Sequence, residues 1–348
     1  MCGVTALWRA GTSAGRAARR RHRVVVATAA LCLVLTGCAA PTPEPTASAS
    51  PPAGPSTAPL RGTPVDPAAA EHPSLAVKID NHPAARPQIA LERADLVFEE
   101  LVEGGLTRYA ALWHSDVPDE VGPVRSIRPM DPDILTSFGG IVAYSGGQPQ
   151  FVQAMQDTGL LNLIHDQDDS AVFERVTDRD APHNVVLAAA EAVDLHADIA
   201  PPPRQFDYAD SAATAGAAET GAPTTTIIAR FSESGERSWS WDAAAGYLRS
   251  QDGSADLDTT GAQLRSTNVV VLRVDVDRST DVPRTILSGS GEAWVSTNGS
   301  TMPATWFKDG AAAPIRLADA NGATVDLAPG NTWIELVPAD DGDVQLVP

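Results

Sequence analysis

Three arginines are the residues of this chain with the clearest capacity for binding chemistry. Arg125 and Arg128 lie in residues 122–129, which read Gly-Pro-Val-Arg-Ser-Ile-Arg-Pro, and Arg108 lies in the apolar stretch 106–114. A guanidinium group binds a phosphate or a carboxylate through two parallel hydrogen bonds. The sequence therefore predicts an anion-binding pocket made of these arginines and Ser126, which stands between two of them. Three acidic residues would orient the arginines: Glu99, Glu100 and Glu103. The alternative is a purely structural network of the same arginines and carboxylates.

A glycine-containing turn is a second candidate for contact with an anion. Ser145, Gly146 and Gly147 follow an apolar segment, 141–144, and precede a helix that we expect to begin at Pro149. Glycine lets backbone N–H groups approach a ligand closely, and the start of a helix favours negative charge. We therefore expect this turn to donate backbone hydrogen bonds to the anion, although such a turn also uses glycine for geometry alone. Its spacing does not match a Walker or a dinucleotide-binding motif.

Four residues could carry acid–base chemistry or hold a metal ion: Asp80, Glu100, Glu103 and His183. Carboxylate oxygens and an imidazole nitrogen are suitable ligands for a divalent cation. The chain has no HExxH motif and no calcium-loop pattern. The sequence therefore assigns no cofactor, and a divalent cation stays an open alternative. A nucleophilic Ser126 or Ser145 acting with His183 is a further alternative, but neither serine lies in a GxSxG motif.

The first 38 residues have the layout of a bacterial lipoprotein signal. Five arginines lie between residues 16 and 23, an apolar run extends from 24 to 35, and Leu35-Thr36-Gly37-Cys38 follows. A basic segment, a short apolar run and small residues before the cleavage site are typical of an export signal. We expect cleavage of residues 1–37, a fatty-acyl chain such as palmitate on Cys38, and anchorage on the outer face of the bacterial cytoplasmic membrane. A plain secretory signal or an uncleaved anchor is the alternative.

Charge and cysteine content limit the partners. The 348-residue chain carries 25 basic and 44 acidic residues. Six of the basic residues and none of the acidic ones lie in 1–37, so the remainder has 19 basic and 44 acidic residues, a net charge of −25. Such a surface repels nucleic acid. We expect two partners: the membrane, reached through the lipid on Cys38, and an anionic envelope glycopolymer or lipid-linked precursor. Cys38 is the single cysteine after residue 37, which excludes an internal disulfide in the processed chain.

Composition divides the rest of the chain into four parts. Residues 38–72 are rich in Pro, Ala, Ser and Thr, which predicts a disordered tether. Residues 73–200 alternate strand-like and helix-like segments, which favours an α/β domain. The expected strands are 75–79, 95–101, 106–114 and 141–144, with a hairpin between the second and third, and the expected helices are 131–138, 149–158 and 185–196. A linker, 201–223, leads to residues 224–348, where β-branched and aromatic runs between turn residues predict a mainly antiparallel β domain.

At these motifs the chain resembles the YerB-like family of bacterial lipoproteins, which is built on a two-part domain of unknown function. The resemblance rests first on residues 80–83, 85–88, 94–108, 122–128, 146–149 and 182–184, and then on residues 289–291, 306 and 329–335. It extends over nearly the whole chain after the signal. It implies a two-part extracytoplasmic lipoprotein and assigns no activity to it.

A narrower likeness concerns the LytR-type envelope phosphotransferases. The chain is similar to them in a strand containing Thr107 and Arg108, followed by the Arg-Ser-x-Arg turn at 125–128. The resemblance implies arginines that hold a polyprenyl pyrophosphate while a glycopolymer is transferred to peptidoglycan. The usual Arg-Asp pair of those enzymes is not reproduced, because Pro129 follows Arg128 and Asp131 is displaced. This departure counts against transferase chemistry.

Three hypotheses about function follow. The leading one is a lipid-anchored extracytoplasmic protein of the cell envelope that binds a phosphate or carboxylate ligand through the arginines. The first alternative is an envelope enzyme for phosphoryl transfer or hydrolysis, with Asp80, Glu103 or His183 as acid–base groups. The second is a scaffold whose residues 224–348 contact protein partners.

Overall fold

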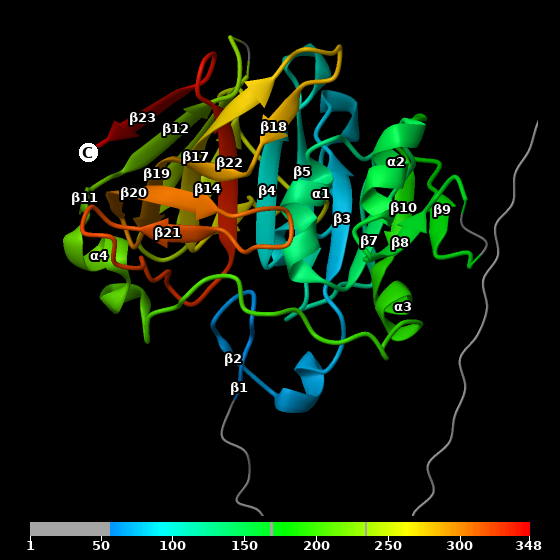
Figure 1. The fold of residues 1–348 in the computed structure, drawn as a ribbon, viewed down its shortest axis with the longest axis horizontal. Helices are drawn as coiled ribbons and strands as arrows, with labels where there is room; N and C mark the ends of the chain where they lie inside the picture. The colour runs from blue at the N-terminus through cyan, green and yellow to red at the C-terminus, as the bar shows by residue number, and fades with distance from the viewer. Residues whose placement is uncertain (1–55, 168–169, 234) are drawn as a thin grey trace, which may run out of the picture. The chain divides into compact units, whose positions relative to one another are not determined.

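The computed structural model describes residues 56–348 except 168, 169 and 234 (Figure 1). The predicted signal, 1–37, the predicted lipidation site, Cys38, and the start of the predicted tether, 39–55, lie outside the described residues. The described residues belong to a single compact unit. Strands predominate over helices in it.

A twelve-stranded sheet runs through most of the described chain. From one edge to the other its strands are β11 (Ala222–Pro223), β20 (Ser300–Lys308), β19 (Gly289–Thr297), β17 (Asn268–Asp277), β22 (Thr332–Pro338), β4 (Leu96–Leu101), β5 (Thr107–Trp113), β3 (Leu75–Asp80), β7 (Ile141–Tyr144) and β8 (Leu161–Ile164), with β18 (Arg284–Ile286) beside β17 and β21 (Arg316–Ala318) beside β20. Strand β22 pairs in parallel with β17 on one side and with β4 on the other. The predicted α/β and β regions therefore share one sheet, which the sequence does not predict.

Smaller sheets complete the strand arrangement. A six-stranded sheet contains β15 (Ser254–Ala255), β14 (Gly246–Gln251), β13 (Glu236–Asp242), β12 (Thr226–Arg230) and β23 (Asp343–Val347), with β16 (Arg265–Ser266) beside β14. A three-stranded sheet contains β6 (Glu120–Val121), β10 (Val185–Ala188) and β9 (Phe173–Arg175), and β1 (Ser56–Thr57) pairs with β2 (Pro64–Val65).

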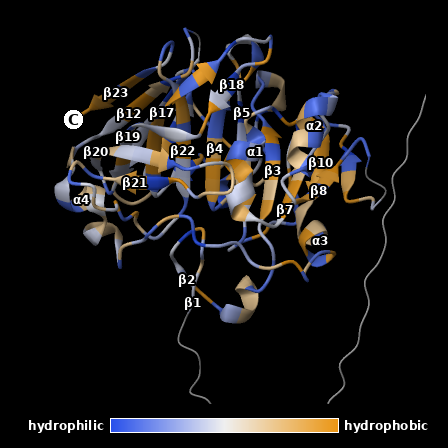
Figure 2. Cartoon of the chain, in the orientation of Figure 1, coloured by the Kyte–Doolittle hydropathy of each residue, from blue (hydrophilic) through white to orange (hydrophobic). Residues whose placement is uncertain are grey.

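Two apolar cores cover the two faces of the large sheet, because side chains along a strand alternate in direction. In β4, Phe98 packs in one core with residues of α1 (Asp131–Leu135) and α2 (Pro149–Gln156), whereas Val97 packs in the other core with residues of the six-stranded sheet. Figure 1 shows α1 and α2 in front of the strands β5, β3 and β7. Strand β7 is largely apolar in Figure 2, and all four of its residues are buried, in keeping with coverage of both its faces.

Most of the elements predicted for residues 73–200 are present. The four predicted strands correspond to β3, β4, β5 and β7, and β4 pairs antiparallel with β5 as in the predicted hairpin. The helix predicted over 185–196 is wrong at its start, because Val185–Ala188 is strand β10 and only Ala189–Asp194 is helical, as α3. The β-branched Val185 and Val186 explain the strand. The strand-rich character predicted after residue 224 is confirmed. The α/β layering of 73–200 stays a prediction, because its helices are short and β3 pairs antiparallel with β5.

The described part of the predicted tether packs against the folded region, so the prediction of disorder is wrong for residues 56–72. Leu60 is buried in the core beside α1 and α2, and Nε of Arg61 lies 2.9 Å from Oδ1 of the buried Asp95. Apolar burial and an ion pair at a buried carboxylate give this segment a fixed position, despite a composition that suits disorder.

The predicted linker, 201–223, also contacts the core. Phe206 is buried, and the hydroxyl of Tyr208 donates to the carbonyl oxygen of Leu60 at 2.7 Å. The short helix α4 (Gly216–Thr220) contributes the buried Ala217. None of the helices in the described part of the chain is both long and apolar enough to cross a bilayer.

Candidate functional site

One cavity of about 220 Å³ brings together most of the charged residues that the sequence singles out. Its charged and histidine side chains include Asp80, Glu103, Arg108, Arg125, Arg128 and His183. Asp80 ends β3 and lies opposite Arg108 in the antiparallel β3–β5 pair. The segment that carries the other two arginines lies along β3, because the amide of Arg125 donates to the carbonyl oxygen of Lys78 at 2.8 Å and the amide of Asp80 donates to that of Pro123 at 2.9 Å. We call this space the arginine cavity.

Arg108 is a nearly buried cation with unused hydrogen-bond donors. The residue as a whole is 8% exposed. Within the described residues its one hydrogen bond runs from Nη1 to the carbonyl oxygen of Ser126 at 3.0 Å, and it makes no ion pair. Burial, followed by repulsion from Arg128, lowers the pKa of Arg108 from its ordinary value to about 10. The group is therefore still charged at neutral pH and would gain from a bound anion.

Arg125 and Arg128 each have a carboxylate beside them and keep N–H groups that have no partner in the part of the chain that the structure describes. Nε of Arg125 lies 3.3 Å from Oδ2 of Asp80, and Nε of Arg128 donates to Oε2 of Glu103 at 2.8 Å. Burial alone would raise the pKa of Glu103, but the hydrogen bond from Arg128 lowers it below its ordinary value. With three guanidinium groups and two carboxylates, the cavity has a formal charge of +1 when its histidines are neutral.

Asp80 organises the two histidines of the cavity. Its Oδ2 lies 2.7 Å from Nδ1 of His183, and its Oδ1 accepts a hydrogen bond from the amide of His82 at 3.1 Å. The two imidazole rings are stacked, with centroids 4.4 Å apart and planes inclined by 12°. A hydrogen bond to one ring nitrogen fixes the orientation of the imidazole. Nε2 of His183 has no hydrogen-bond partner among the described residues.

Glu100 lies outside the cavity and is not paired with an arginine. Its carboxyl group forms an ion pair with Lys78, whose Nζ also lies 2.7 Å from Oδ1 of Asp131. All three side chains are fully buried. Burial, followed by repulsion from Asp131, raises the pKa of Glu100 to about 7. Asp131 also accepts a hydrogen bond from the amide of Arg128 at 2.6 Å. The cluster therefore supports the arginine segment through Asp131 and does not line the arginine cavity.

The serines and glycines that the sequence singles out lie beside the arginine cavity and do not line it. Ser126 and Ser145 have their hydroxyl oxygens 3.3 Å apart, and the amide of Ser145 donates to the carbonyl oxygen of Arg125 at 3.0 Å. A Cβ atom on Gly146 would lie 2.4 Å from Oδ2 of Asp166, and one on Gly147 would lie 2.8 Å from Ile127. Residues 145–147 thus hold the arginine segment in place and pack against Asp166. Direct donation from residues 145–147 to a ligand stays a prediction.

A metal site is not evident among the residues described. They contain no group of three or more His, Cys, Asp and Glu side chains arranged to hold an ion. Asp80, Glu103 and His183 line one cavity, whereas Glu100 is paired with Lys78 elsewhere. The divalent cation stays a prediction, and Glu100 would not be one of its ligands in this conformation.

Glu99 belongs to a buried ionic cluster that the sequence analysis missed. Its Oε1 accepts from Nε of Arg237 at 2.8 Å and from the hydroxyl of Thr107 at 2.6 Å, and its Oε2 pairs with Arg249. Burial would raise the pKa of Glu99, but Arg249 and then Arg237 lower it to about 2. A signal for these arginines was present: residue alternation places Arg237 on the same face of β13 as Trp239, which is fully buried.

Comparison with known proteins agrees with this architecture. Residues 60–198 match the model of the DUF3048 N-terminal domain, described as a protein of unknown function, and residues 227–334 match that of the DUF3048 C-terminal domain. The chain is 26% identical over 309 residues to a Bacillus subtilis protein described as "Putative lipoprotein YerB". The alignment covers 81% of this chain and 86% of the relative.

The fold is also similar to a solved structure. The crystal structure of YerB from Bacillus subtilis matches with a TM-score of 0.72 and 23% sequence identity, over 83% of this chain and 99% of that one. The N-terminal and C-terminal domain models match this chain in that order, and the alignment with the Bacillus subtilis relative covers most of both proteins. The chain therefore belongs to the YerB-like family of DUF3048 proteins.

Proposed function

We propose that this protein is a lipid-anchored component of the bacterial cell envelope that binds an anionic ligand, a phosphate or a carboxylate, in the arginine cavity. The observation that carries the proposal is Arg108, a nearly buried guanidinium group without an ion-pair partner among the described residues. A buried charge is costly unless it is paired. A bound anion would supply the missing partner.

The surroundings of Arg108 support the same conclusion. Arg125 and Arg128 face the same cavity, so a tetrahedral or planar oxyanion could accept from more than one guanidinium group. The chain as a whole is strongly acidic, with 25 basic and 44 acidic residues. A cavity with three arginines is therefore a local exception to the charge of the protein. The region 73–200, for which we propose an α/β layer arrangement, contributes every residue of this site.

The membrane anchor is supported by the sequence and by the relative. The run from 24 to 35 and Cys38 have the pattern of a lipoprotein signal, and the matched Bacillus subtilis protein is described as a lipoprotein. Two or more acyl chains anchor a protein stably to a bilayer. We place the protein on the outer face of the cytoplasmic membrane, where envelope glycopolymers and lipid-linked precursors are within reach. Mass spectrometry of the protein from its native host should find residues 1–37 removed and Cys38 acylated; an unprocessed chain would contradict the anchor.

Titration of inorganic phosphate into the purified protein tests the anion site. Arg125→Gln should weaken phosphate binding by ~10- to 100-fold, because it removes charged hydrogen bonds to the anion. Arg230→Gln is the matched control, since Arg230 is about as exposed and also pairs with carboxylates, Glu236 and Asp343, but lies in the six-stranded sheet. Equal affinity of the wild type and the Arg125→Gln variant would remove the arginine cavity from the proposal.

A second candidate function is an enzyme for hydrolysis or transfer at a phosphoryl centre, distantly like the LytR-type phosphotransferases. One observation favours it: Nδ1 of His183 lies 2.7 Å from the carboxylate of Asp80, in the same cavity as the arginines. A carboxylate that orients a histidine is a common arrangement for general-base catalysis. Turnover of a pyrophosphate-linked lipid that is lost in His183→Ala would support the enzyme. Its absence at every divalent-cation concentration would leave the binding function alone.

A further inference from the structure

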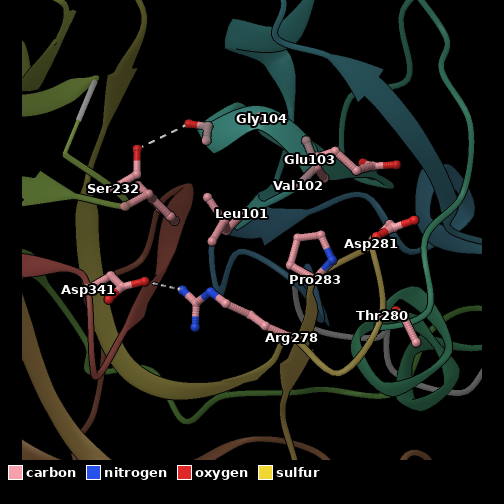
Figure 3. Close-up of a pocket in the computed structure, with 12 residues that line it drawn as sticks. Leu101, Val102, Glu103, Gly104, Ser232, Arg278, Thr280, Asp281, Pro283 and Asp341 are labelled. Atoms are coloured by element: carbon pink, nitrogen blue, oxygen red, sulfur yellow. Dashed lines mark hydrogen bonds and ion pairs between the residues drawn. The ribbon is translucent and has the colours of Figure 1, made fainter.

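A second cavity adjoins the arginine cavity and shares two of its wall residues. This second cavity has a volume of about 310 Å³ and is lined, like the first, by Val102 and Glu103. The shared wall is the turn that links β4 to β5, and Glu103–Gly105 form a 3₁₀ turn there. Figure 3 shows Glu103 and Val102 at one side of the second cavity, with Leu101 and Pro283 between them and the Arg278–Asp341 pair. A ligand held by the arginines could therefore extend past Glu103 into this space.

The second cavity has a different chemistry from the first. Its apolar part comes from Leu101, Phe231 and Pro283. Arg278 is already engaged, because its Nη2 lies 2.9 Å from Oδ2 of Asp341 and its Nη1 lies 2.7 Å from Oδ2 of Asp340. Its guanidinium is thus balanced by acids, and the cavity repels a second anion.

Asp281 offers a free acceptor on the rim of the second cavity. Its side chain is exposed, and within the described residues its carboxylate has neither a hydrogen bond nor an ion pair. The hydroxyl of Thr280 lies next to it in the chain and also lines the cavity. Carboxylate and hydroxyl oxygens accept hydrogen bonds from ligand hydroxyl groups, and the apolar wall suits the C–H face of a ring. This combination fits a neutral polyhydroxyl ring better than a hydrocarbon chain.

We infer that the ligand is a sugar phosphate, with its phosphate in the arginine cavity and its sugar ring in the second cavity, an inference that rests on the proposed anion-binding function. The two cavities meet at Glu103, which lines both of them and accepts a hydrogen bond from Nε of Arg128 at 2.8 Å. The sugar adds contacts that free phosphate lacks. Binding energy from this second part adds to that of the anion.

Calorimetric titration with five probes tests the inference: inorganic phosphate, glucose, glucose 1-phosphate, propyl phosphate and aminoethyl phosphate. Glucose 1-phosphate should bind about tenfold more tightly than inorganic phosphate, which corresponds to about 1.4 kcal/mol, and glucose alone should bind weakly. Asp281→Asn should bring the affinity for glucose 1-phosphate close to that for phosphate and leave phosphate binding unchanged. Asp309→Asn is the matched control, since Asp309 is an exposed carboxylate paired with Arg316 outside both cavities.

Each result separates the sugar subsite from the anion site. An equal or larger gain from propyl phosphate would overturn the sugar in favour of an apolar chain, and a gain specific to aminoethyl phosphate would overturn it in favour of an amine. Equal affinity for glucose 1-phosphate and inorganic phosphate would overturn the second subsite and leave the anion site in place. Failure of every phosphate probe to bind, or indifference of all of them to Arg125→Gln, would overturn the anion site itself.

Discussion

Asp80 and His183 are 103 residues apart in the chain, and Oδ2 of the first lies 2.7 Å from Nδ1 of the second. The same oxygen lies 3.3 Å from Nε of Arg125. One nearly buried carboxylate thus connects the end of β3, the arginine segment and the loop before β10. Asp80 therefore helps to set the shape of the arginine cavity.

Replacing Asp80 by asparagine should destabilise the protein by about 1–3 kcal/mol, because His183 and Arg125 lose a charged acceptor that is itself nearly buried. Urea unfolding measures this loss. Asp343→Asn is the control, since Asp343 pairs with Arg230 at an exposed position and such a pair contributes about 0–1 kcal/mol. Equal midpoints for the wild type and the Asp80→Asn variant would mean that Asp80 does not hold these segments together.

Replacing Glu99 by glutamine should have a larger effect. The change leaves the buried Arg237 without its carboxylate, whereas Arg249 keeps its ion pair with Asp256, and an uncompensated buried charge costs about 3–5 kcal/mol. Thermal and urea unfolding of Glu99→Gln should show this loss. The control is Glu236→Gln, which removes a more exposed partner of Arg230 and should change stability much less. Similar losses in the two variants would argue against the buried ionic cluster.

The pH dependence of stability should carry the signature of Glu335. Burial, followed by repulsion from Glu99 and opposed by Arg249, raises the pKa of Glu335 from 4.5 to about 8. The folded state therefore binds this proton more tightly than the unfolded state, so the stabilisation is complete below pH 4.5 and is lost as the pH rises through about 8.

Glu335→Gln removes this titration while keeping an oxygen that can accept from Nε1 of Trp239, a hydrogen bond of 2.7 Å in the wild type. The variant should gain stability over the wild type above pH 8, on the order of a few kcal/mol, and little near pH 4.5. Urea unfolding at both pH values measures the difference. A constant difference across this range would contradict the raised pKa of Glu335.

A substitution of Leu60 tests whether the folded region already includes this residue. Leu60→Ala should cost about 2–5 kcal/mol, because the side chain is 1% exposed and packs in the core with α1 and α2. Leu195→Ala is the control, since Leu195 is 54% exposed and should stay within about 0.5 kcal/mol of the wild type. A negligible effect of Leu60→Ala would restore the prediction of a disordered segment there.

The local elements around the site could be predicted from the sequence because they depend on local patterns. Apolar runs predict β3, β5 and β7, and Pro149 marks the start of α2. The grouping of Arg108 with Arg125 and Arg128 follows from their spacing and from the scarcity of basic residues in an acidic chain. These residues do share one cavity.

Long-range pairing could not be predicted in the same way. Strand β22 lies between β17 and β4, and Trp333 is opposite Val97 although 236 positions separate them. Nothing in the local pattern of either strand specifies its partner, because buried strands of this kind are apolar on both faces. The pairing of Glu99 with Arg237 and Arg249 depends on the same long-range arrangement of strands. The prediction from the sequence therefore paired Glu99 with the wrong arginines. Likewise, a Pro- and Ala-rich composition did not reveal that Leu60 is buried.

The most direct test of the anion site is anomalous diffraction from a crystal of the protein soaked in tungstate, a tetrahedral oxyanion with a heavy atom. The account predicts a peak in the arginine cavity, within hydrogen-bond distance of the guanidinium groups of Arg108 and Arg125, and its loss in Arg125→Gln. An arginine cavity that stays empty at saturating tungstate, in crystals where the oxyanion is bound elsewhere, would contradict it.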